Sequence, residues 1–366
     1  MKILHINTEK TWRGGEQQLL NLLQGLRERG ISSHLVCQPD SPLEKKAKKA
    51  DIKVLPVGMR GEGDLIASFH CRRLINRFNY DIIHSHTSHA HTLAFFASLG
   101  KKAKRLVTRR VDFSIFRHSF LHLSGIKYRF MADYYIAISR KIKDVLVDDG
   151  ISAKRIFVAH SGINPERFVS ASMDPLISEF ALKKNDPVVV NVAHLAGHKG
   201  QEYLVRAIPL VLERIPNARF FIVGAGELMD KLHSLANSLG LDQRLVFSGF
   251  RSDVGSFYQI ADLFVMSSVQ EGLGTAVLDA LALGKPVVAT NSGGIPEIIQ
   301  DGVTGKLVEA ANPAALAQGI VEMLTSREKA TRMAVRGQMR VLKDFTIDAM
   351  VEKNVAVYRH ILADMP

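Results

Sequence analysis

The segment from residue 267 to residue 279 combines a glycine turn with two carboxylates. It reads SSVQEGLGTAVLD, so Glu271 precedes the turn and Asp279 lies in the stretch that follows it. Thr275 and Asp279 are four residues apart, which puts them on one face of a helix. Carboxylate oxygens accept hydrogen bonds from sugar hydroxyl groups. The pattern favours a site in which Glu271 and Asp279 contact different points of one ligand, with capping or solvation as the alternative for Asp279.

Two other loops carry residues suited to a phosphate. The segment NVAHLAGHKG contains His194, His198 and Lys199, and a cation there could neutralise a phosphate. In TWRGGEQQLL, Gly14 and Gly15 directly precede a helical stretch, where backbone N–H groups can approach an anion. Taken singly, these signals also fit an exposed lysine and a tight turn. The turn between the two carboxylates makes the phosphate interpretation the stronger one.

Short apolar runs alternate with helical stretches along the whole chain, which predicts an α/β fold. Helix 16–29 shows the helical spacing, with Leu19, Leu22, Leu23 and Leu26 on one stripe. The predicted strands are 2–6, 33–37, 53–57, 82–84, 105–108, 135–138, 188–192, 219–223, 245–248, 263–266, 286–289 and 305–307. We expect two doubly wound parallel sheets, each covered by helices on both faces, with ligands at the carboxyl ends of the strands.

The length of 366 residues exceeds what one hydrophobic core usually organises, so two domains are expected. The predicted divisions are a Rossmann-like domain over 1–165, a linker over 166–186, a second Rossmann-like domain over 187–344 and a helical segment over 345–366. The linker is placed where proline, serine and aspartate interrupt any clean periodicity.

Composition excludes several classes of protein. Hydrophobic residues make up 46% and charged residues 23%, so a disordered or low-complexity chain is excluded. Cys37 and Cys71 lack metal-ligand spacing, which argues against a disulfide framework or a zinc site. No apolar run approaches the ~18 residues of a membrane span, and residues 1–10 resemble a strand rather than a signal peptide. We therefore expect a cytoplasmic protein.

The positive charge is confined to the first half of the chain. Residues 1–164 hold 28 Lys and Arg against 14 Asp and Glu, a charge of +14, whereas residues 165–366 hold 20 against 22, a charge of −2. A run over 101–110 contains six cations, of which Arg109 and Arg110 follow a predicted strand together with Asp112. Such a half could attract nucleic acid, an anionic membrane or an acidic substrate.

Several motifs, in order along nearly the whole chain, resemble the retaining GT-B glycosyltransferases of family four. The resemblance is most specific in EGLGTAVLD, the following GKPVV, and SGGIPE at 292–297. DIIHSH at 81–86, ADYYIAIS at 132–139 and VGAG at 223–226 also match. This family has two Rossmann-like domains that face a central cleft, with the acceptor bound by the N-terminal one and the nucleotide sugar by the C-terminal one. It also implies that the last helix crosses back onto the first domain.

The resemblance implies a role for each matching residue. Glu271 would contact hydroxyl groups of the donor sugar, Lys199 would neutralise the diphosphate and His86 would approach the transferred sugar, which makes these three the catalytic candidates. Asp279 replaces the usual glutamate at the ribose, and His194 replaces the usual arginine, with His198 or an arginine of the first domain as substitutes. The remaining donor-binding candidates are Gly14, Gly15, Gly226, Phe250, Arg251, Leu273, Gly274 and Thr275; Arg109, Arg110 and Asp112 are the acceptor-binding candidates.

The expected reaction is transfer of a hexose from a nucleotide-diphosphate sugar, UDP-hexose before GDP-mannose, to a hydroxyl of an anionic cell-envelope glycolipid such as a lipopolysaccharide core intermediate. No Asp-x-Asp motif occurs, so we expect a metal-independent reaction without a cofactor. Attack on the face from which the leaving group departs is favoured. His86 as a general base is the minor alternative, and Glu271 as a covalent nucleophile is less favoured still. The basic half also predicts reversible contact with an anionic membrane, through clusters such as 101–110 and without insertion.

Three other classes remain to be distinguished. A non-hydrolysing nucleotide-sugar epimerase would share the fold and the donor. An NAD-dependent dehydrogenase needs G-x-G-x-x-G after the first strand, which Gly14 and Gly15 do not supply. A nucleic-acid-binding protein would explain the basic half but not the paired acids, so no nucleic-acid partner is expected.

Overall fold

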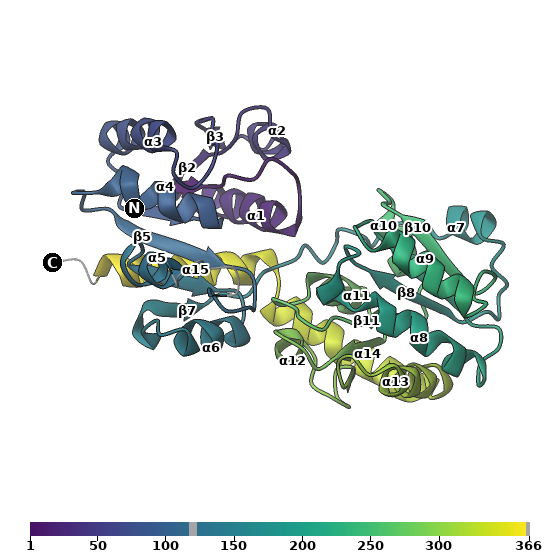
Figure 1. Cartoon of the computed structure of the whole chain (residues 1–366). Helices are drawn as coiled ribbons and strands as arrows, with labels where there is room; N and C mark the ends of the chain where they lie inside the picture. The colour runs from purple at the N-terminus through teal and green to yellow at the C-terminus, as the bar shows by residue number, and fades with distance from the viewer. Residues whose placement is uncertain (117–122, 364–366) are drawn as a thin grey trace. The chain divides into compact units, whose positions relative to one another are not determined.

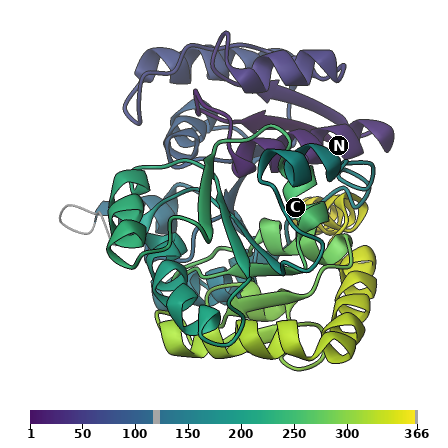
Figure 2. The same cartoon turned by 90° about the vertical axis from the view of Figure 1, so that its right-hand side faces the viewer.

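The computed structural model describes residues 1–116 and 123–363. The chain folds into two compact units. Unit 1 consists of Met1–Gly162 and Ile347–Pro366, and unit 2 consists of Ile163–Thr346. Each unit is built around a parallel sheet with helices on both faces (Figures 1 and 2). This is the doubly wound α/β architecture predicted from the alternation of apolar strands and helices.

The sheet of unit 1 has seven strands within the described residues, in the order β3-β2-β1-β4-β5-β6-β7. The strands are β1 (Lys2–Ile6), β2 (Ser32–Val36), β3 (Lys53–Val54), β4 (Ile82–Ser85), β5 (Lys104–Arg109), β6 (Tyr134–Ala137) and β7 (Ile156–Val158). The order reverses beside β1, so the carboxyl ends of β1 and β4 form a switch point, where ligands of such sheets bind.

Helices of unit 1 cover the two faces with distinct apolar clusters. They are α1 (Gly14–Glu28), α2 (Pro42–Lys49), α3 (Leu65–Phe78), α4 (Ser88–Ser98), α5 (Leu123–Phe130), α6 (Arg140–Asp148) and α15 (Ile347–Ala363). Leu4 and Ile6 of β1 face α3 and α4, whereas Ile3 faces α1 and α15. Helix α15 packs so closely on α1 that a side chain at Gly25 would overlap Val351. The last helix is therefore part of unit 1.

The sheet of unit 2 has six strands within the described residues, in the order β10-β9-β8-β11-β12-β13. The strands are β8 (Val188–Val192), β9 (Arg219–Val223), β10 (Leu245–Gly249), β11 (Leu263–Met266), β12 (Val287–Thr290) and β13 (Lys306–Val308). The helices are α7 (Asp174–Glu179), η3 (Gly197–Lys199), α8 (Gln201–Leu212), α9 (Met229–Ser238), α10 (Val254–Ile260), α11 (Thr275–Ala282), α12 (Ile295–Ile298), α13 (Pro313–Thr325) and α14 (Arg327–Asp344). Its switch point lies between β8 and β11.

The predicted strands are confirmed to within one residue at each end, except β3. That strand ends at Val54 rather than at residue 57, although the backbone N–H groups of Leu55 and Val57 still donate to β2 and the residue after it. Strand β7 was not predicted. Within the described residues, no helix combines the length and the apolar character that a membrane span requires.

The segment predicted as a linker over 166–186 is instead packed into unit 2. It contains α7, whose Leu176 is fully buried in a cluster with Val190, Phe221 and Phe257. Before it, Phe168 stacks on Tyr258 with ring centroids 5.5 Å apart. The sequence did not indicate this packing, because a short helix with one buried leucine among proline and polar residues shows no hydrophobic periodicity.

Candidate functional site

Lys199 and Glu271 form an ion pair at the carboxyl edge of the second sheet. Lys199 ends η3 after β8, Glu271 lies in the turn after β11, and β8 and β11 are neighbours. The Lys199 Nζ lies 2.5 Å from Glu271 Oε2, and the two side chains are only 19% and 11% exposed. Ser268 Oγ donates to the same carboxylate oxygen at 3.2 Å. The structure thus brings together two of the three predicted catalytic residues.

Backbone contacts fix the two loops against each other. The carbonyl of His198 accepts from the N–H groups of Val269 and Gln270 at 2.8 and 3.1 Å. Gly200 has φ +63°, and a Cβ there would lie 2.2 Å from the Ser267 carbonyl oxygen. Gly293 has φ +55°, and a Cβ there would lie 1.8 Å from the Glu271 carbonyl oxygen. Both positions require glycine, so the Lys199–Glu271 pair is held by the loop backbones.

The glycine turn leads directly into α11. Gly274 has φ +100° and is the N-cap residue of the helix, Leu273 before it is buried, and Thr275 is the first helical residue. The first N–H groups of a helix have no carbonyl acceptor within it and carry positive partial charge. Leu273, Gly274 and Thr275 thus place an anion-attracting helix start next to Glu271, as the sequence predicts.

Asp279 lies one turn into α11, on the same helix as Thr275. Burial raises the pKa of the Asp279 carboxyl to about 7, and the nearby charge of Arg167 opposes this rise only partly. Burial of Tyr258, together with the Asp279 charge, raises the pKa of the Tyr258 hydroxyl. A carboxyl with this pKa can donate or accept a hydrogen bond near neutral pH, which suits a hydroxyl ligand.

The raised pKa gives a stability prediction for Asp279→Asn. The folded chain keeps a proton on Asp279 that the unfolded chain releases above pH ~4, so wild-type stability falls as pH rises from about 4 to 7. Asparagine does not titrate, so the melting temperature of the variant relative to wild type should be higher at pH 8 than at pH 4.5. Calorimetry at the two pH values measures this, with Asp230→Asn on the exposed side of α9 as the control. If the melting temperatures of Asp279→Asn and wild type differ by the same amount at both pH values, the raised pKa of Asp279 is contradicted.

His194 lies in an exposed part of the loop after β8. Its Nε2 is 3.3 Å from Glu227 Oε2, with both side chains more than half exposed. Gly226 packs under this loop, since a Cβ there would lie 2.3 Å from the Leu195 carbonyl oxygen. The loop that carries His194, His198 and Lys199 thus packs on Gly226; their binding of the donor stays a prediction. Ser268 and Glu227 were missed, because a serine and a glutamate in loops carry no distinctive signal.

Phe250 and Arg251 lie after β10 and differ in environment. The Arg251 guanidinium donates to Glu179 and Asp253 at 2.8 to 3.0 Å, and these carboxylates raise its pKa. Phe250 is 83% exposed. Arg251 thus fastens α7 to α10, and the exposed ring of Phe250 is the part of this pair suited to stacking on a base.

A cavity of about 780 Å³ lies in unit 1. Gly15, His86, Arg109 and Arg110 line it, together with Glu62, Ser88 and Lys127, which the sequence analysis missed. Lys127 Nζ donates to Glu62 Oε1 at 2.6 Å, and Ser88 Oγ donates to the same oxygen at 3.0 Å. Gly14 lies beside Gly15 at the start of α1. The predicted acceptor-binding arginines therefore face a cavity large enough for a sugar.

The predicted basic cluster over 101–110 is not a continuous surface patch. Arg105 pairs with Asp133 at 2.7 Å, Arg109 donates to the Tyr128 hydroxyl and the Phe113 carbonyl, and Arg110 contacts His86. Asp112 is half-buried and is not among the described residues that line the cavity. Lys101 and Lys102 remain exposed. The sequence shows that the cations are close along the chain but not where each side chain points, so it could not indicate that they have separate partners.

His86 belongs to a buried group with His5 and His84, whose ring nitrogens lie within 4.8 Å of one another. Arg110 Nη2 donates to His86 Nδ1 at 3.3 Å, so His86 carries its proton on Nε2, which lies 3.0 Å from His5 Nδ1. A metal at Nε2 would require a proton on Nδ1, facing Arg110. The three histidines therefore do not fit a metal ion. The same tautomer, and a pKa lowered by burial, disfavour His86 as a general base.

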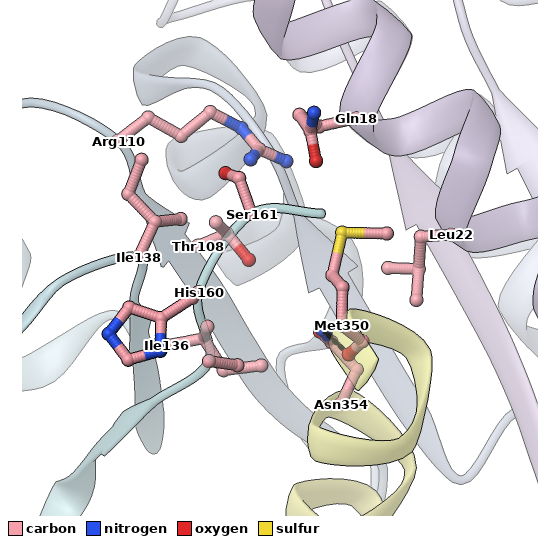
Figure 3. A pocket seen from close by; sticks show the side chains of 11 residues that line it. Gln18, Leu22, Thr108, Arg110, Ile136, Ile138, His160, Ser161, Met350 and Asn354 are labelled. Atoms are coloured by element: carbon pink, nitrogen blue, oxygen red, sulfur yellow. Dashed lines mark hydrogen bonds between the residues drawn. The ribbon is translucent and has the colours of Figure 1, made fainter. Parts of the chain in front are cut away.

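Arg110 also borders a small cavity of about 10 Å³ in unit 1. Figure 3 shows Arg110 and Gln18 on one side and Met350 and Asn354 of α15 on the other. The cavity has about the size of one water molecule and is too small for a sugar. Burial lowers the pKa of Arg110 to about 10, so the side chain is still a cation at pH 7. Arg110 therefore supplies positive charge to the larger cavity.

Comparison with known proteins gives matches over both units. The protein-family model described as "Glycosyl transferases group 1" matches residues 173–340. The family model described as "Glycosyltransferase Family 4" matches residues 12–167. The chain is 30% identical over 304 residues to the putative glycosyltransferase EpsD of Bacillus subtilis, which covers 78% of each chain. It is 33% identical over 180 residues to LpsE, a lipopolysaccharide core biosynthesis glycosyltransferase of Rhizobium meliloti, which covers 49% of this chain and 51% of LpsE.

A solved structure has the same fold over nearly the full length. Anabaena Alr3699/HepE in complex with UDP superposes with a TM-score of 0.87 at 22% identity, covering 98% of this chain and 100% of that one. At this identity the likeness shows the fold.

Proposed function

The chain belongs to the group 1 glycosyltransferases with the GT-B fold, and we propose that it transfers the hexose of a UDP-hexose to a hydroxyl group of a membrane-held anionic glycolipid. The configuration at the anomeric carbon would be retained. As a member of this family it is an enzyme that uses a nucleotide sugar. GDP-mannose is the second candidate donor. Membership of this family leaves the dehydrogenase and nucleic-acid hypotheses without support.

The observation that carries the proposal is the Lys199–Glu271 pair beside the start of α11. Transfer builds negative charge on the leaving diphosphate, and a lysine with aimed N–H groups stabilises that charge in place. The transferred sugar of the donor would hydrogen-bond to Glu271. The ribose of its nucleotide would hydrogen-bond to Asp279, and the base of the nucleotide would stack on Phe250. The UDP named for the HepE complex supports uridine as the base.

The proposed chemistry needs no metal ion and no covalent enzyme intermediate. The acceptor oxygen bonds to the anomeric carbon as the bond from that carbon to the phosphate oxygen breaks, on the same face. The acceptor proton passes to the departing phosphate oxygen. Lys199 and the N–H groups at the start of α11 stabilise the phosphate while this bond breaks.

The acceptor would occupy the cavity of unit 1, where Arg110 supplies a cation beside His86. The name of LpsE supports a lipopolysaccharide core intermediate as the acceptor class. An acceptor of this kind is held in a bilayer, so we propose that the enzyme is peripheral on the inner face of the cytoplasmic membrane.

A thermal-shift panel of nucleotide sugars tests the donor. A UDP-hexose at about 100 times its dissociation constant stabilises the folded state by about 2.7 kcal/mol, which for units of this size raises the melting temperature by about 5–10 °C. We expect the largest shift with a UDP-hexose and a smaller one with UDP alone. A larger shift with GDP-mannose would indicate that the donor carries guanosine rather than uridine. No shift with any nucleotide sugar would contradict the proposal.

A further inference from the structure

The outer face of α3 exposes three large apolar side chains. Leu65, Ile66 and Phe69 are 66%, 70% and 57% exposed, whereas Ala67, Cys71 and Ile75 on the inner face are buried in the core of unit 1. Helix α3 lies at the outer edge of unit 1 (Figure 1). Exposed apolar groups of this size, gathered within one turn, mark a surface that another body covers.

Cations continue the same face toward the end of the helix. Arg73 and Arg77 follow Phe69 at four-residue spacing and are exposed, with the Arg73 guanidinium 5.6 Å from the Phe69 ring centroid. Helix α3 contains no acidic residue. The acid before it, Asp64, accepts hydrogen bonds from the N–H groups of Arg60 and Ala67 at 2.9 Å and caps the helix.

The end of α4 extends this surface. Arg72 Nη1 donates to the Leu99 carbonyl at 2.7 Å, which fastens α3 to the segment that carries exposed Leu99, Lys101 and Lys102. We call Leu65, Ile66, Phe69, Arg73, Arg77, Leu99, Lys101 and Lys102 the α3 surface. It combines apolar groups with cations and no acid.

We propose that the α3 surface docks on an anionic lipid bilayer, with Leu65, Ile66 and Phe69 entering the boundary between headgroups and acyl chains. An amphipathic helix with cations beside its apolar groups lies in this plane, and each cation attracts anionic lipid. In a symmetric dimer formed through this surface, Arg73 and Arg77 of both copies would share one interface with no acidic residue of α3 to pair with them. Nucleic acid offers no partner for leucine and isoleucine. The charges therefore select lipid.

Docking through α3 also explains how a lipid-held acceptor reaches unit 1. Glu62 lines the 780 Å³ cavity and precedes the first apolar residue of the surface, Leu65, by three positions. The cavity wall thus adjoins the end of α3 that enters the lipid. This step rests on the proposed function, whereas docking itself does not. It keeps Lys101 and Lys102 of the cluster over 101–110 expected from the sequence, and it replaces the expectation of binding without insertion.

Sedimentation with vesicles tests the proposal without donor or acceptor, so its outcome is independent of glycosyl transfer. The wild-type chain should sediment with phosphatidylcholine vesicles that contain phosphatidylglycerol at about 0.05 M salt and much less at about 0.5 M. The variant Leu65→Ser/Ile66→Ser/Phe69→Ser should bind at least about tenfold more weakly, and Arg73→Ser/Arg77→Ser about tenfold more weakly.

Unit 2 offers a matched control. Val335, Met339 and Leu342 on α14 are 49%, 67% and 45% exposed, so Val335→Ser/Met339→Ser/Leu342→Ser removes similar apolar groups elsewhere and should leave vesicle binding unchanged. Phe69→Trp should show a blue shift of its fluorescence with anionic vesicles, and this readout needs no loss of a side chain from α3.

Three results would overturn the proposal. These are wild-type protein that stays in the supernatant at low salt, a triple α3 variant that binds like wild type, and Phe69→Trp fluorescence that vesicles leave unchanged. Light scattering adds a fourth, because a wild-type dimer that the triple α3 variant converts to a monomer would assign the surface to self-association.

Discussion

Lys199→Ala should lower kcat by about 100- to 1000-fold while the chain remains folded. Lys199 Nζ lies 2.5 Å from Glu271 Oε2 at the carboxyl edge of the second sheet, where the donor diphosphate is proposed to bind. Its removal takes away the charge that stabilises the leaving phosphate, which acts mainly in the transition state. Steady-state kinetics with the cognate donor measure this loss, and circular dichroism checks the fold.

Two variants separate this effect from a general loss of surface charge. Lys231→Ala removes a lysine that is 69% exposed on α9 and also close to a carboxylate, Glu202 at 3.6 Å, and should leave kcat unchanged. Lys199→Arg keeps the charge in a different shape and should retain part of the activity. Activity of Lys199→Ala within a few fold of wild type would show that Lys199 does not contact the phosphate.

Glu271→Gln should lower turnover by about 100-fold, more than Asp279→Asn does. Glu271 is proposed to hold the reacting sugar, whereas Asp279 is proposed to hold the ribose, remote from the bond that breaks. Asp279→Asn should therefore act mainly on KM for the donor, by up to about tenfold, which corresponds to the loss of one hydrogen bond. Remote contacts also contribute to rate, so the difference between the two variants is graded.

The controls for this pair use the neighbours of Glu271. Ser268→Ala removes the hydroxyl that donates to Glu271 Oε2 at 3.2 Å and should cost less than Glu271→Gln. If Glu271→Gln and Asp279→Asn change kcat and KM by the same factors, the separate roles are wrong.

The elements and the donor loops could be predicted because their signals are local. Lys199 and Glu271 are 72 residues apart, yet each follows a strand with a clear apolar run, and the carboxyl ends of parallel strands lie at one edge of the sheet. Gly274 marks the start of a helix in the sequence itself. The fold and the positions of the donor loops could therefore be predicted from the hydrophobic periodicity and from the placement of glycines.

Other features depend on contacts that no local pattern records. Tyr358 donates or accepts at His84 Nδ1, 2.8 Å away and 274 residues earlier in the chain. Arg251 looked available for a nucleotide, but Glu179 of α7 holds it, and that helix was predicted to be a linker. Arg105, Arg109 and Arg110 looked like one basic patch, but β5 and the loop after it turn them toward different partners.

Product analysis with a ¹³C-labelled UDP-hexose and a lipid extract that contains lipopolysaccharide core intermediates tests the central claim most directly. We expect the label to appear on a glycolipid, UDP to be released in equal amount, and the NMR coupling at the anomeric carbon to show the configuration of the donor. Label that remains on the nucleotide as an epimerised sugar, with no acceptor required, would contradict glycosyl transfer and assign the donor site to an epimerase.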